Sequence, residues 1–103
     1  MGIDLEWTNE DRSTIQFLGD GAGTFTRILL NAGDQSDTCC LQFIDPFGDT
    51  IFNQRQLSVL TLELKALLSE LSDTESQEKV KAILKLLGQA EGKTHTYIKF
   101  VGD

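Results

Sequence analysis

Histidine and cysteine are scarce in this sequence, which limits the chemistry that it can support. There is one histidine, His95, and two adjacent cysteines, Cys39 and Cys40. A zinc site needs three or four nitrogen or sulfur ligands, and neighbouring residues on a strand point to opposite faces. No flanking motif supports a nucleophilic pair of a cysteine with His95. We therefore expect free thiols, one buried and one exposed, with no catalytic residues, no metal and no cofactor.

Long apolar runs are also absent. No run approaches the roughly 20 residues that a transmembrane helix needs. The opening MGIDLEWTNED lacks the basic and apolar regions of a signal peptide. The content of 40% hydrophobic and 24% charged residues is that of an ordinary globular protein. We expect one cytoplasmic domain that spans residues 1–103 and does not bind membranes.

Positive charge is nearly missing from the first half of the chain. Residues 1–54 hold nine acidic and two basic residues, whereas residues 55–103 hold seven of each. The whole net charge of −7 therefore belongs to the first half. A field of that sign repels phosphate backbones and anionic lipids, which argues against nucleic acid and membrane partners. Basic protein surfaces or cations are better candidates.

Short apolar runs separated by turn residues predict antiparallel strands in the first half. The last run closes with Asp45-Pro46-Phe47-Gly48, which suits a type I turn whose Asp45 side chain accepts a backbone N–H. The expected strands are residues 3–7, 13–18, 24–30 and 38–44.

The second half changes to a helical period. Asn53 and Gln56 have the form of a capping box, and apolar residues then recur every three or four positions from Leu57 to Leu71. A second helix is expected to begin near Ser72 or Thr74 and to stop at Gly88. Residues 94–101 return as a strand.

The predicted order is β-β-β-β-α-α-β. Strands followed by helices indicate an α+β domain, in which an antiparallel sheet of four to five strands carries an αα-hairpin on one face. We expect the final strand to lie beside an early strand, at the centre of the sheet.

Acidic loops are the candidate site. The loop at 45–56 lacks the EF-hand pattern, so Asp45 is interpreted first as a turn former. An exposed Phe47 between carboxylates would resemble an interface hot spot with an acidic rim. The candidate partner-binding residues are Asp34, Asp37, Asp45, Phe47 and Asp49.

The function favoured by the sequence is a small acidic cytoplasmic module that binds a basic protein surface without catalysis. Bacterial immunity proteins and inhibitors of basic toxins are analogous in size and charge only. Two alternatives stay open: a domain that binds a divalent cation through these aspartates and Asp20, and a small enzyme that uses His95. The protein is expected to be a monomer or a homodimer formed through the helix at Leu57–Leu71.

Overall fold

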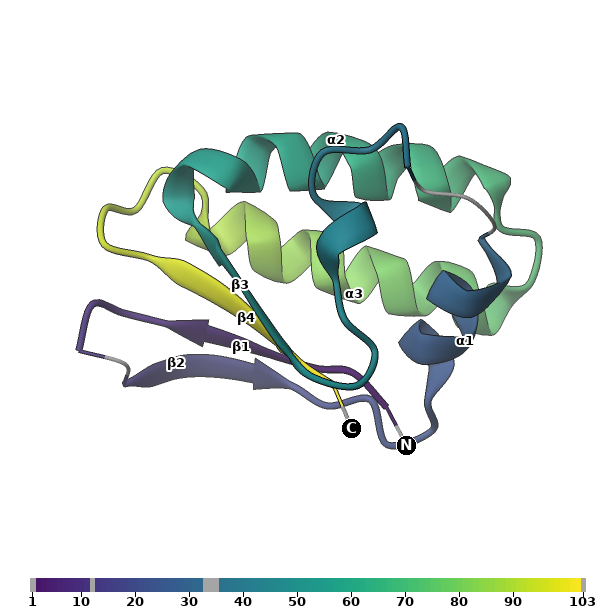
Figure 1. Ribbon diagram of the computed structural model, residues 1–103, viewed down its shortest axis with the longest axis horizontal. Coiled ribbons are helices and arrows are strands. Elements are labelled where there is room, and N and C mark those ends of the chain that lie inside the picture. The colour runs from purple at the N-terminus through teal and green to yellow at the C-terminus, as the bar shows by residue number, and fades with distance from the viewer. Residues whose placement is uncertain (1, 12, 33–35, 103) are drawn as a thin grey trace.

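The computed structural model describes residues 2–11, 13–32 and 36–102 and shows an α+β fold. The four strands form one antiparallel sheet in the order β2-β1-β4-β3, and α2 and α3 lie over one face of it (Figure 1). The strands are β1 (Asp4–Thr8), β2 (Thr14–Leu18), β3 (Asp49–Asn53) and β4 (Tyr97–Val101). The helices are α1 (Thr24–Asn31), α2 (Gln54–Glu70) and α3 (Thr74–Ala90), with a short 3₁₀ turn η1 (Leu41–Phe43). The α+β prediction is confirmed, with four strands.

The final strand occupies the centre of the sheet, as predicted. β4 pairs with β1 on one side and with β3 on the other. Its Phe100 lies opposite Leu5 of β1, and its Ile98 lies opposite Phe52 of β3. These side chains are buried and belong to the hydrophobic core. The alternation expected for 3–7, with Ile3, Leu5 and Trp7 buried, is also present.

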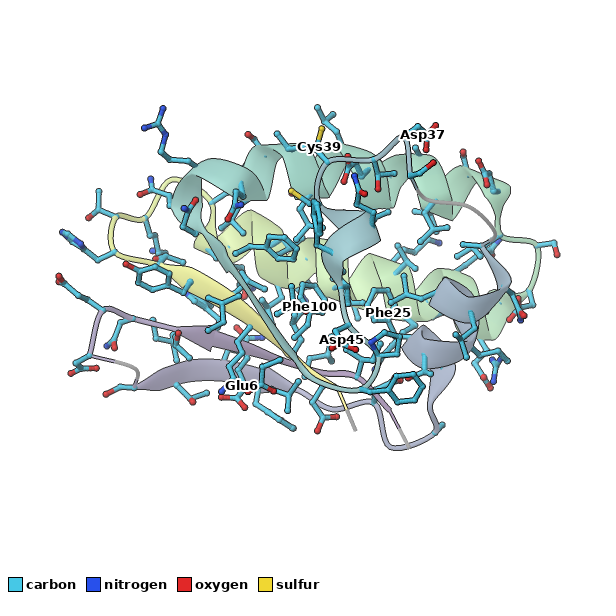
Figure 2. The ribbon with its side chains drawn as sticks, viewed as in Figure 1. Glu6, Phe25, Asp37, Cys39, Asp45 and Phe100 are labelled. Carbon is cyan, nitrogen blue, oxygen red and sulfur yellow. The ribbon has the colours of Figure 1, made fainter. Side chains whose placement is uncertain are left out.

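The core fills the space between the sheet and the helices. Phe25 of α1 stacks on Phe100, with 5.8 Å between ring centroids (Figure 2). The apolar stripe of α2 faces this core, since Leu57, Leu60 and Leu64 are fully buried. The stripe is thus used within one chain, and Leu62, on the other side of α2, is exposed. The dimer contact expected along α2 therefore stays a prediction.

The strand expected at residues 24–30 is wrong: this segment is the helix α1. Its β-branched threonines favour a strand, but the buried side chains follow a helical spacing, from Phe25 to Ile28. The carboxylate of Asp20 accepts hydrogen bonds from the N–H groups of Phe25 and Thr26, which have no partner inside the helix. These hydrogen bonds at the first turn, together with the burial of Phe25 and Ile28, override local strand propensity.

The strand expected at residues 38–44 is also wrong. This segment is irregular and contains only the 3₁₀ turn η1. Its backbone N–H groups are satisfied by a side chain of α2, so it has no need of a neighbouring strand. Cys39 is nonetheless exposed and Cys40 is buried, both as free thiols, as expected. Burial first, and then the nearby charge of Glu63, raises the pKa of the Cys40 thiol.

The remaining strand of the sheet, β3, forms from residues that the sequence analysis placed in the loop at 45–56. β3 covers Asp49–Asn53, directly between the Asp45–Gly48 turn and α2. Asp49 pairs with Val101 and Asn53 with Tyr97. The turn, the strand and the helix follow one another without intervening residues. For this reason the strand was not recognised as a separate apolar run in the sequence.

The helix starts are partly as predicted. Asn53 Oδ1 accepts the N–H of Gln56 at 3.2 Å, and Gln56 Oε1 accepts the N–H of Asn53 at 2.8 Å, so the capping box is confirmed. The N-cap of α3 is Asp73, which accepts the N–H of Ser76, and not one of the two candidates proposed. The helix also continues past Gly88 to Ala90, so the predicted stop is wrong.

Candidate functional site

Residues 36–48 carry most of the candidate site, and we call them the crossing segment. This segment leads from α1 to β3 and passes across the helical layer on the way (Figure 1). It begins near the outer side of α2, where Asp37 and Cys39 lie, and ends near the sheet with Asp45 (Figure 2). Two local structures hold it in place, one at Glu63 and one at Asp45.

Glu63 of α2 anchors the first part of the crossing segment. Its carboxylate accepts three backbone N–H groups, from Cys39 at 2.5 Å, Cys40 at 2.9 Å and Leu41 at 3.1 Å. Burial alone would raise the pKa of this carboxyl, but the three donors together hold it below its ordinary value. Glu63 therefore stays ionised and fixes the backbone that leads into η1.

The Asp45–Gly48 turn anchors the second part, in the way that the sequence predicted. Asp45 Oδ1 accepts the N–H of Phe47 at 2.8 Å, and the N–H of Gly48 lies 3.4 Å from the carbonyl oxygen of Asp45. Thr50 Oγ1 accepts the N–H of Asp45 and donates to the carbonyl of Phe43. A Cβ at Gly48 would come within 2.8 Å of Asp45 Oδ2, so a larger residue there would displace the Asp45 carboxylate.

Two aromatic side chains project from this anchored backbone. Phe43 is 65% exposed and Phe47 is 66% exposed. Beside them, a small apolar hollow lies between α1 and the crossing segment, lined by Leu29, Leu30, Leu41, Gln42, Ile44 and Pro46. Large apolar side chains that are held in water by a rigid turn are typical of a binding surface. The sequence analysis missed Phe43, because it placed this residue in a strand.

The carboxylates of the candidate site do not form one cluster. Asp45 in the turn and Asp49 at the start of β3 lie on either side of Phe47 in the chain, and Asp49 Oδ2 lies 3.4 Å from Lys99 Nζ. Asp37 lies apart from them, at the outer side of α2 (Figure 2). Asp34 lies outside the described residues. The structure thus brings together Asp45, Phe47 and Asp49 and separates Asp37.

Asp37 has acidic neighbours that the sequence analysis did not identify. A hollow of about 300 Å³ is lined by Asp37, Glu63 and Glu70 together with small and apolar residues, and its lining contains no basic side chain. Glu63 and Glu70 are seven residues apart, two helical turns, so a search for exposed α2 positions on one face would have found the pair. All the charged side chains in the described lining of this hollow are therefore acidic.

Asp20 serves the fold and not a surface site. It is 2% exposed, and its carboxylate accepts the N–H groups of Ile3 at 3.0 Å and Phe25 at 3.1 Å. Lys79 Nζ lies 3.4 Å from Asp20 Oδ1. Within the described part of the chain, no three histidine, cysteine or acidic side chains are placed to hold a metal ion. Of the described aspartates proposed for a cation site, Asp20 is buried and Asp37 lies apart from Asp45 and Asp49.

His95 lies far along the chain from the crossing segment and has a partner of its own. His95 lies in the loop that precedes β4, and its Nδ1 is 3.6 Å from Oε2 of Glu10, which lies between β1 and β2. Its backbone φ is 56°, the left-handed region that non-glycine residues rarely adopt. The thiol of Cys40 instead points to the carbonyl oxygen of Gln56, 3.9 Å away. The structure records no contact between His95 and either cysteine.

Comparisons with protein-family models, curated proteins and solved structures return no match for this chain. Among the described helices, none has the length and apolarity needed to cross a membrane.

Proposed function

We propose that this chain is a small cytoplasmic interaction module that binds a basic protein surface through the crossing segment and the first residue of β3, without catalysis. The binding residues are Asp37, Phe43, Asp45 and Phe47 of the crossing segment, together with Asp49 at the start of β3. Asp34 belongs to the same acidic stretch of sequence. Glu63 has a positioning role, because it holds the backbone of the segment.

One observation carries this proposal. Between Arg27 and Arg55 the sequence contains four aspartates and no lysine, arginine or histidine. The same stretch presents two aromatic side chains that are about two-thirds exposed, Phe43 and Phe47. Acidic residues and exposed aromatic anchors thus share one surface segment whose backbone is fixed by side-chain hydrogen bonds.

Each part of this surface suits a basic protein partner. The aromatic side chains supply apolar area at low entropic cost, because the turn already restricts their backbone. The acidic hollow at Asp37 can accept a lysine or arginine side chain, since none of the described residues that line it is basic. Unpaired negative charge also accelerates encounter with a positive surface.

The charge of Asp49 is partly compensated by Lys99. An exposed ion pair of this kind contributes little stability, about 0–1 kcal/mol. A partner arginine can therefore compete for Asp49 at small cost. The N–H of Phe47 is accepted by Oδ1 of Asp45, and Oδ2 of the same carboxylate takes no part in that hydrogen bond.

The test is capture of partners from the lysate of the native host at roughly 50 mM and roughly 500 mM salt. The proposal expects a basic protein that is retained at the lower salt and lost at the higher one. Phe47→Ser should reduce its capture by roughly tenfold or more, because it removes a central anchor. The matched control is Leu62→Ser, which removes an equally exposed side chain from α2. Capture that is insensitive to salt and to Phe47→Ser would contradict the proposal.

A further inference from the structure

The apolar hollow between α1 and the crossing segment is large enough to hold one side chain of another protein. Its volume is about 130 Å³, and its lining residues are Leu29, Leu30, Leu41, Gln42, Ile44 and Pro46. Five of these six residues are apolar and none is charged. A cavity of about 150 Å³ with an apolar lining accepts a ring of the size of benzene. The hollow therefore has the size and the surface for one leucine or phenylalanine side chain.

The wall that the crossing segment contributes is fixed by the fold. Leu41 and Ile44 are 4% and 6% exposed and belong to the hydrophobic core. The N–H of Leu41 donates to Glu63 Oε1 at 3.1 Å, and the N–H of Ile44 donates to the carbonyl oxygen of Leu41 at 3.2 Å. An apolar site that is formed in advance requires little reorganisation when it is filled.

The wall that α1 contributes ends in an exposed side chain. Leu29 is half-buried and packs against the core, whereas Leu30 is 64% exposed. Leu30 thus resembles Phe43 and Phe47 in exposure, although it comes from a different element. Exposed apolar side chains next to an apolar hollow are typical of a surface that contacts another protein.

Charge indicates which protein would fill the hollow. Asp45 is the residue between Ile44 and Pro46, which both line it. Residues 28–54 contain no lysine, arginine or histidine. A positively charged segment that enters the hollow would therefore meet an aspartate beside it, whereas an acidic segment would be repelled. A second copy of this chain, with its net charge of −7, is disfavoured for the same reason.

We propose that the basic partner inserts one large apolar side chain, of leucine or phenylalanine size, into this hollow and places a lysine or arginine next to Asp45. This inference rests on the proposed function, because it specifies what the basic partner presents to the crossing segment. It extends the binding surface onto α1, through Leu30. Burial of a side chain of this size changes an affinity by roughly tenfold or more.

The test uses synthetic peptides as probes, so it does not depend on capture of the natural partner. The main probe is Lys-Lys-Phe-Lys-Lys with blocked termini. One matched peptide has alanine in place of the phenylalanine, and another has glutamates in place of the lysines. Each peptide is added to the full chain up to about 5 mM at roughly 50 mM salt, and the methyl NMR signals of Leu29, Leu30, Leu41 and Ile44 report occupancy.

We expect the phenylalanine peptide to shift these methyl signals. The alanine peptide should bind roughly tenfold or more weakly, because it leaves the hollow unfilled. The glutamate peptide should leave the signals unchanged, because Asp45 repels it. All three comparisons use the wild-type chain, so they hold whatever a substitution does to the fold.

A substitution in the wall of the hollow gives a second readout. Leu30→Ser should weaken binding of the phenylalanine peptide by roughly threefold or more, because it removes apolar surface from the α1 wall. Leu62→Ser is the matched control, since Leu62 is 67% exposed on α2 and lies outside the lining of the hollow. Circular dichroism verifies the fold of both variants.

The outcomes separate this inference from the proposed function. Methyl signals that do not move with the phenylalanine peptide overturn the inference, and so does equal binding of the alanine and phenylalanine peptides. An equal loss in Leu30→Ser and Leu62→Ser also contradicts it. Equal binding of the two basic peptides leaves the acidic surface intact, because they carry the same charge. The proposed function fails by another result, capture from the lysate that is insensitive to salt and to Phe47→Ser.

Discussion

At the scale of single residues, two carboxylates organise this fold by accepting backbone hydrogen bonds. Asp20 joins the start of β1 to the first turn of α1 and also lies 3.4 Å from Lys79 on α3. Glu63 holds the crossing segment against α2 through three N–H groups. Both were visible in the sequence as acidic residues, but Ile3 lies 17 positions from Asp20, and the three N–H partners of Glu63 lie 22 to 24 positions from it. Distance along the chain is why sequence reasoning assigned Asp20 to a loop and gave Glu63 no role.

Asp20→Asn is expected to lower the free energy of unfolding by about 3 kcal/mol. The amide has one acceptor oxygen in place of two, and it leaves the mostly buried ammonium of Lys79 without a counter-charge. Urea denaturation at neutral pH measures the loss. The control is Asp37→Asn at an exposed position, which should change stability by no more than about 0.5 kcal/mol. A loss at Asp20 as small as that of the control would refute the role given to this carboxylate.

Glu63→Gln is expected to cost about 2 kcal/mol at neutral pH, because its amide nitrogen faces backbone N–H donors and one charged acceptor is lost. The pKa of Glu63 in the folded chain is below its ordinary value of 4.5. Its contribution is therefore complete above about pH 4.5 and disappears as pH falls through the lower, folded-state pKa. The stability difference between wild type and Glu63→Gln should shrink over that acidic range.

Urea denaturation at a series of pH values measures this difference. Glu70 lines the same hollow as Glu63, so Glu70→Gln is the matched control on the same helix. That variant should lose little stability at neutral pH. A difference for Glu63→Gln that remains constant down to about pH 2 would contradict the charged anchor.

At the scale of elements, the sequence predicted most where local signals and packing agree. The capping box at Asn53 and Gln56 and the leucine period after it specify α2 without outside help. The segment at Thr24–Asn31 is different, since its threonines favour a strand while Phe25 and Ile28 are spaced for a helix. Only the acceptor supplied by Asp20 decides between these alternatives. The candidate turn was predictable because Asp45, Pro46 and Gly48 act within four residues.

Two glycines test how helix ends are set. Gly88→Ala should stabilise the protein by about 0.5–1 kcal/mol, because Gly88 lies inside α3 and an added Cβ meets no atom within 4 Å. Gly23→Ala should instead destabilise it by about 1–2 kcal/mol, since Gly23 has a φ of 70° at the N-cap of α1. Thermal denaturation of both variants measures these opposite effects. A destabilising Gly88→Ala would mean that the helix ends at Gly88, as its sequence had suggested.

At the scale of the whole molecule, charge and apolar surface are distributed unevenly. The crossing segment combines exposed aromatic side chains with aspartates, whereas strand β2, at the edge of the sheet, is uncharged. The sequence predicted the acidic half, but it treated exposure of Phe47 only as a condition for a binding surface. It did not predict that β2 lies at an edge, because which strand lies at an edge depends on the order β2-β1-β4-β3, and that order arises from long-range pairing.

We propose that binding of the basic protein depends on where the acidic residues lie, and not on the total charge of the chain. Two triple variants separate these factors, since both change the net charge from −7 to −4. One neutralises the proposed surface, with Asp37→Asn, Asp45→Asn and Asp49→Asn. The other neutralises exposed acids elsewhere, with Glu10→Gln, Glu78→Gln and Glu91→Gln. Asparagine at position 45 can still accept the N–H of Phe47, so the turn is retained.

The most direct measurement is the association rate of each triple variant with the captured basic protein at roughly 50 mM salt. We predict that the aspartate variant associates roughly tenfold or more slowly than wild type, and that the glutamate variant stays within roughly threefold of wild type. Equal slowing in both variants would show that net charge alone governs the encounter. That result would contradict the assignment of binding to the crossing segment.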